Sequence, residues 1–104
     1  MASLIYGSPG TTVQFDDRTL AHLRVVLLAK LRREEKFALN FTDSVTANAR
    51  TLWFHPAIAL QFEFDSSAEI SLNRAWVDAL TASANSGAGL RVVAEESIGV
   101  RSRV

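Results

Sequence analysis

Apolar and polar residues alternate with a period of two in two short runs near the start of the chain, residues 3–6 and 12–15. Such alternation is typical of strands that bury one face. Gly7, Ser8, Pro9 and Gly10 lie between the runs, and a Pro-Gly pair favours a type II turn because proline fixes φ and glycine accepts the positive φ that follows. The two runs therefore predict a β-hairpin.

A helical period follows over residues 18–33. The leucines in it are three or four positions apart, as expected for one buried stripe of a helix: Leu20, Leu23, Leu27 and Leu31. The aspartates at 16–17 supply an N-cap acceptor, and the arginines at 32–33 lie where the helix dipole favours cations. Because the glutamates at 34–35 would be unfavourable at that end, we expect the helix to stop before them.

The period of two returns at residue 36 and predicts three further strands. They cover residues 36–41, 51–55 and 58–64, with a polar loop over 42–48 and a turn at His55-Pro56-Ala57. A second helix of about fifteen residues is capped by Ser71, and its predicted buried face is made by Leu72, Trp76, Ala79, Leu80 and Ser83.

The second helix should end through a residue with positive φ at Asn85-Ser86-Gly87, before a last strand over residues 90–93. We therefore predict an α+β fold, β-β-α-β-β-β-α-β, with a mainly antiparallel sheet of five to six strands and both helices packed on one face. Residues 1–94 form the predicted single domain, and residues 95–104 are expected to be a mobile tail.

Composition excludes several classes of protein. The chain has no cysteine, so it has no disulfide, no thiol nucleophile and no cysteine-based zinc site. Its 11 basic and 11 acidic residues balance, so the chain lacks the excess of basic residues that is typical of a general nucleic-acid binder. The start of the chain does not resemble a signal peptide, and the longest apolar run, residues 25–29, is too short to span a bilayer. We expect a cytoplasmic protein.

The first helix carries more apolar surface than one core requires. Besides the leucine stripe, a second flank contains apolar residues beside a histidine and an arginine: His22, Val25, Val26, Ala29 and Arg33. A helix that is apolar on two flanks is either enclosed by its own fold or contacts a partner. For the second case we predict a non-catalytic module that works by protein–protein contact, with these five residues as its interface. A second copy of the chain is the favoured partner because two-fold dimers are the commonest oligomers.

The alternative function is nucleic-acid binding by an accessory domain. The cations near the end of the first helix form its predicted interface: Arg24, Lys30, Arg32, Arg33 and Lys36. The glutamates at 34–35 and the zero net charge weigh against it, since such charge runs are usually solvated helix ends.

The sequence offers few candidate residues for catalysis or metal binding. His22 and His55 are 33 positions apart without further ligands at metal spacing, so we predict no metal and no cofactor. No nucleophile elbow or catalytic triad is apparent, and we predict no enzyme activity. The least supported functional hypothesis is an enzyme with a small pocket near Trp53, His55 and Trp76.

Several stretches of the chain resemble a family of small uncharacterised proteins from Microbacteriaceae and related actinobacteria: LIYGS at 4–8, DDRTLAHLRVVLLAKLRREE at 16–35, LWFHPAIALQFEF at 52–64 and LNRAWVDALTASANSGAGLRVV at 72–93. Proteins of that family often carry the label ATP-dependent DNA ligase, so the resemblance implies a link to DNA ligation or repair. Such ligases attack ATP with the lysine of a Lys-x-Asp-Gly motif. Lys30 precedes Leu-Arg-Arg and Lys36 precedes Phe-Ala-Leu, so neither lysine fits the motif.

Overall fold

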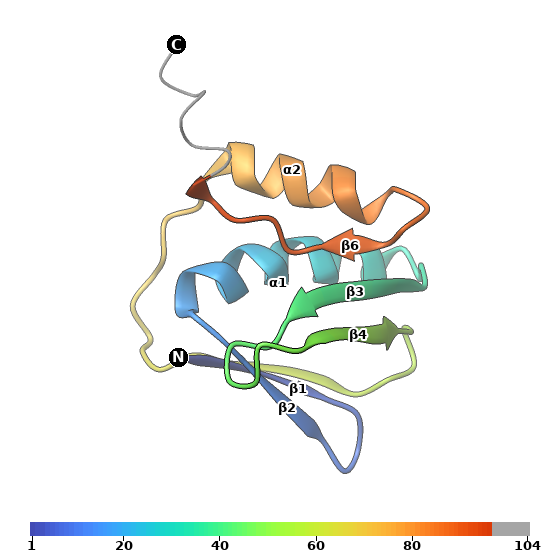
Figure 1. The fold of residues 1–104 in the computed structure, drawn as a ribbon, viewed down its shortest axis with the longest axis horizontal. Coiled ribbons are helices and arrows are strands. Elements are labelled where there is room, and N and C mark those ends of the chain that lie inside the picture. The colour runs from blue at the N-terminus through green and yellow to red at the C-terminus, as the bar shows by residue number, and fades with distance from the viewer. Residues whose placement is uncertain (97–104) are drawn as a thin grey trace.

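The computed structural model describes residues 1–96 and confirms an α+β fold with the predicted order of elements (Figure 1). Two helices and six strands follow one another: β1 (Ala2–Tyr6), β2 (Thr11–Phe15), α1 (Asp17–Arg32), β3 (Phe37–Thr42), β4 (Ala49–Phe54), β5 (Leu60–Glu63), α2 (Arg74–Ala84) and β6 (Leu90–Arg91). Residues 97–104, most of the predicted tail, lie outside the described residues.

The strands form two three-stranded sheets, and the prediction of one sheet with five to six strands is wrong. β1 lies between β2 and β5 and is antiparallel to both. β3 lies between β4 and β6, antiparallel to β4 and parallel to β6. The two sheets separate because β5 pairs with β1 and not with the preceding β4. Side-chain alternation identifies a strand but not its neighbour, and consecutive strands are adjacent in only about two-thirds of cases.

The predicted hairpin is confirmed, with Leu4 of β1 opposite Val13 of β2. Its turn has positive φ at Gly7 (88°) and not at Gly10, where the sequence placed it. β5 begins at residue 60 and not at 58, because the amide of Ile58 donates to the carbonyl of His55 and extends the turn. β6 is likewise shorter than predicted and covers residues 90–91.

The first helix agrees closely with its prediction. Asp16 caps α1: one carboxylate oxygen accepts the amide of Thr19 at 3.1 Å and the other accepts its hydroxyl at 2.6 Å. α1 ends at Arg32, and Glu34 follows with a φ of 59°, a conformation that terminates a helix. Of the leucine stripe, Leu31 is half-buried, and three members are fully buried: Leu20, Leu23 and Leu27.

The second helix begins later than predicted. Asn73, and not Ser71, is its N-cap, because the Asn73 side-chain oxygen accepts the amides of both Ala75 and Trp76. Leu72 therefore precedes α2 and is 51% exposed, so its predicted place on the buried face is wrong. The positive φ that follows α2 is at Gly89 (89°), where a Cβ atom would come within 2.9 Å of the Ala38 carbonyl oxygen.

Aromatic side chains join the two sheets into one core. Phe54 of β4 stacks on Phe37 of β3 at 5.3 Å between ring centroids and lies 5.2 Å from Tyr6 of β1. Phe15 of β2 lies 5.4 Å from Phe41 of β3. Residues of both sheets therefore belong to one hydrophobic core. α1 packs against β1 and α2, and α2 packs against β6 (Figure 1).

Candidate binding surfaces and pocket

Three apolar residues on the solvent side of α1 form an exposed surface, which we call the outer face: Val25, Leu28 and Ala29. Val25 and Leu28 are each 38% exposed, and they lie one turn apart. The predicted interface included Val25 and Ala29 but missed Leu28. The signal was present in the sequence, since Leu28 follows Val25 at a spacing of three.

Two residues of the predicted interface are not on the surface. His22 and Val26 are buried, because their flank of α1 faces α2. The His22 ring lies 4.3 Å from the Trp76 ring of α2, and Val26 follows one turn later. Arg33 is exposed, and its guanidinium lies 3.4 Å from the Glu35 carboxylate.

His22 connects the two helices through hydrogen bonds. Its Nε2 accepts a hydrogen bond from the backbone amide of Asn73 at 2.8 Å. Nδ1 therefore carries the hydrogen and donates to the backbone carbonyl of Arg18 at 2.7 Å. Asn73 is the N-cap of α2. The imidazole therefore fixes the start of α2 against the first turns of α1, which is a structural role and not a surface contact.

The predicted cationic cluster does not form one surface. Lys30 is buried, and its ammonium donates to the Ala84 carbonyl at 3.3 Å and the Asn85 side chain at 3.1 Å, at the end of α2. The same ammonium pairs with Glu35 at 2.8 Å. Arg24 lies over the Phe64 ring at 4.8 Å. Arg32, Arg33 and Lys36 remain exposed, but Lys30 is unavailable to a phosphate.

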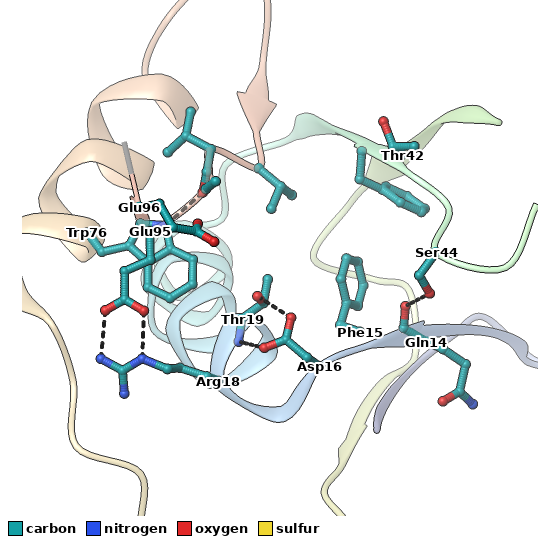
Figure 2. Close-up of a pocket in the computed structure, with 14 residues that line it drawn as sticks. Gln14, Phe15, Asp16, Arg18, Thr19, Thr42, Ser44, Trp76, Glu95 and Glu96 are labelled. Atoms are coloured by element: carbon teal, nitrogen blue, oxygen red, sulfur yellow. Dashed lines mark hydrogen bonds and ion pairs between the residues drawn. The ribbon is translucent and has the colours of Figure 1, made fainter. Parts of the chain in front are cut away.

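A pocket of about 1060 Å³ lies where the ends of β2 and β3 meet the first turn of α1 and the segment after β6 (Figure 2). The apolar part of its lining comes from both sheets, α2 and the C-terminal segment: Phe15, Phe41, Trp76, Val92 and Val93. Its polar lining includes Asp16, Thr19 and Ser44, which Figure 2 shows around the opening beside Phe15. Of these residues, only Trp76 is predicted from the sequence to belong to a candidate site, the suggested enzymatic pocket.

The wall of this pocket is held by an ion pair between α1 and the C-terminal segment. The Arg18 guanidinium donates two hydrogen bonds of 2.7 Å to the Glu95 carboxylate (Figure 2). The side-chain amide of Asn73 donates a third at 3.0 Å. The tail predicted to start at Glu95 is therefore anchored at its first residue. The hydrogen bonds from Arg18 and then Asn73 lower the pKa of the Glu95 carboxyl from 4.5 to about 2.

Replacing Glu95 by glutamine is expected to reduce stability only above acidic pH. Because the folded-state pKa is depressed, the pair stabilises the protein fully above about pH 4.5, and this contribution is lost as the pH falls toward 2. For a partly exposed bidentate pair we expect about 1 kcal/mol at neutral pH. Urea unfolding of the wild type and Glu95→Gln between pH 2 and 7 measures the difference, which should shrink below pH 4.5. Glu96→Gln is the control, and an equal effect there would contradict the assignment.

The three residues of the suggested enzymatic pocket do not come together. Trp76 lines the pocket of about 1060 Å³, whereas Trp53 lines a separate hollow of about 370 Å³ with Lys36. The Nδ1 atom of His55 accepts the Ala57 amide at 3.0 Å, so His55 stabilises the predicted turn. This arrangement offers no shared site for Trp53, His55 and Trp76.

Within residues 1–96, no three histidine, aspartate or glutamate side chains gather where they could hold a metal ion. Over the same residues, neither helix has the length and apolar character needed to cross a membrane.

Comparison with known proteins identifies a family but no functional relative. A family described as a domain of unknown function matches residues 1–95, in agreement with the resemblance to an uncharacterised family. Neither the curated proteins nor the solved structures contain a match to this chain.

Proposed function

Since the chain belongs to the family of the domain of unknown function DUF7882, we propose from its own structure that it is a cytoplasmic, non-catalytic module that acts by protein–protein contact. In this proposal its first partner is a second copy of the same chain, bound through the outer face of α1. The observation that supports it most is that Val25, Leu28 and Ala29 stay exposed although two other flanks of the same helix are buried.

The outer face has the form that a symmetric helix contact needs. Leu28 is at its centre, with Val25 and Ala29 within one turn, and Arg24 and Arg32 at its two ends. In a two-fold pair each helix presents the same residues, so Leu28 packs against Leu28 of the second copy. Crossing at the common angle of about 50° brings the apolar centres together and lets the arginine-bearing ends diverge. A face this small suits a weak dimer.

Nucleic-acid binding is the less favoured alternative, because Lys30 is committed to α2 and Glu35. Arg32, Arg33 and Lys36 would have to carry it, and Arg33 lies beside Glu35. An actinobacterial origin and a link to DNA ligation rest on the sequence resemblance alone.

Leu28→Asp is expected to convert the dimer into a monomer, because a carboxylate at the centre of an apolar contact would have to be desolvated. We expect a wild-type Kd in the micromolar range and a loss of at least tenfold in the variant. Size-exclusion chromatography with light scattering, from about 10 µM to 1 mM, measures both. Val45→Asp is the matched control, since Val45 is 78% exposed in the loop between β3 and β4 and is not part of the outer face.

A wild type that remains monomeric at 1 mM would overturn the self-association. An equal shift in Leu28→Asp and Val45→Asp would show that added charge, and not the outer face, controls association. A salt-sensitive complex with DNA that Arg32→Glu abolishes, in a protein that stays monomeric, would support the nucleic-acid alternative.

A further inference from the structure

We propose that the pocket between β2, β3 and the C-terminal segment binds an amphipathic organic cation: an apolar body that carries an ammonium or guanidinium group. This inference is independent of the proposed contact through α1, because the pocket and the outer face share no residue.

The apolar half of the pocket fits an aromatic or branched aliphatic body. Phe15 and Phe41 are nearly buried, with ring centroids 5.4 Å apart and ring planes tilted by 56°. Val92 and Val93 of the segment after β6 are half-buried and line the same pocket. The volume of about 1060 Å³ is at the upper end of the range for small-molecule sites. An apolar group placed there would leave water and contact rings from both sheets.

The charge of the lining selects a cation over an anion. Among residues 1–96, three carboxylates and one guanidinium line the pocket, and the Arg18 guanidinium is already neutralised by Glu95. Asp16 and Glu96 therefore carry the charge that remains, and within residues 1–96 neither one forms an ion pair. The Asp16 oxygens accept hydrogen bonds from Thr19, but a carboxylate has about four acceptor sites, so both oxygens retain capacity for a ligand N–H group.

The N-terminus of α1, which by itself would attract an anion, does not reverse this preference. Asp16 is the N-cap there, and its carboxylate accepts a hydrogen bond from the backbone amide of Thr19. A ligand carboxylate would therefore meet a carboxylate in place of unpaired amides. Phenethylammonium combines the two required properties, whereas 3-phenylpropionate keeps the ring and reverses the charge, and ethylammonium keeps the charge without the ring.

Calorimetry of the full chain with these three probes tests the proposal. We expect phenethylammonium to bind in the micromolar to millimolar range and each of the other two at least tenfold more weakly. Fluorescence of Trp76, which lines the pocket, should change with phenethylammonium in a Trp53→Phe background, because the remaining tryptophan then reports on the pocket alone.

Charge-removing variants locate the site. Asp16→Asn keeps an N-cap of equal quality, and Glu96→Gln changes an exposed side chain, so each should preserve the fold and weaken binding about threefold to fivefold. Asp78→Asn, on the exposed side of α2, should leave binding unchanged. Equal binding of the cationic and anionic probes, no binding of phenethylammonium, or an equal loss in Asp78→Asn would each overturn the proposal. If Asp16→Asn fails to fold, Glu96→Gln alone decides.

Discussion

Replacing Phe54 by alanine is expected to lower the free energy of unfolding by about 3–5 kcal/mol, which is a large part of the total stability of a domain this size. Phe54 is 1% exposed and contacts Phe37 within its own sheet and Tyr6 in the other sheet. Truncation would remove the ring from both contacts and leave a cavity between the sheets. Chemical unfolding followed by far-ultraviolet circular dichroism measures the loss.

Trp53→Ala is the matched control for this prediction. Trp53 is the preceding residue of β4, is larger than Phe54, and points to the opposite side of the strand, where it is 55% exposed. We expect a loss of less than about 1 kcal/mol there. Equal losses at the two positions would show that β4 contributes through its backbone pairing and not through the aromatic contact between the sheets.

The sequence predicts α1 well because several local signals agree. The N-cap at Asp16, the leucine spacing and the glutamates that follow Arg33 all lie within the helix or beside it. Local interactions of this kind are formed in the same way whatever the rest of the fold does. The hairpin of β1 and β2 is predicted for the same reason, since its strands and turn are contiguous.

Sheet pairing is predicted poorly because it depends on contacts between distant residues. β1 pairs with β5, with Leu4 opposite Phe62, and β3 pairs with β6, with Leu39 opposite Leu90. Leu4, Leu39 and Leu90 would be buried equally well in one large sheet or in two small ones, so their pattern does not select between them. The start of α2 is predicted wrongly for a different reason. Ser71 and Asn73 are both good N-cap residues, and the hydrogen bond with His22 favours Asn73.

The exposed faces of α1 and the pocket likewise depend on contacts between residues that are distant in the sequence. The excess of apolar residues on α1 is readable from sequence, but which flank meets α2 depends on the position of α2. The His22 and Val26 flank is covered, and the Val25 and Leu28 flank is not. The pocket lining comes from residues 14–16, 18–19, 41–42, 44, 76 and 92–96, which no local pattern connects. The negative charge that remains on the lining becomes apparent only once Arg18 is seen to pair with Glu95.

His22 is the position where the sequence-based and structural interpretations of α1 diverge most, so its substitution has a large and informative expected effect. His22→Leu introduces an apolar side chain of similar size, which removes the acceptor for the backbone amide of Asn73 and the ring contact with Trp76. An unsatisfied buried amide costs about 1–3 kcal/mol and a ring pair contributes about 0.5–1.5 kcal/mol. We therefore expect a loss of about 2–4 kcal/mol, measured by urea unfolding.

His22→Gln is the matched variant, because its side-chain amide offers an acceptor to Asn73 and should recover part of that loss. Amide hydrogen exchange in the first turn of α2, at Ala75 and Trp76, should be faster in His22→Leu than in the wild type, since Asn73 caps that turn. If His22 were a surface contact residue, His22→Leu would leave stability and exchange unchanged and would instead alter the association of the protein. The two measurements together therefore distinguish a residue that positions α2 from one that recognises a partner.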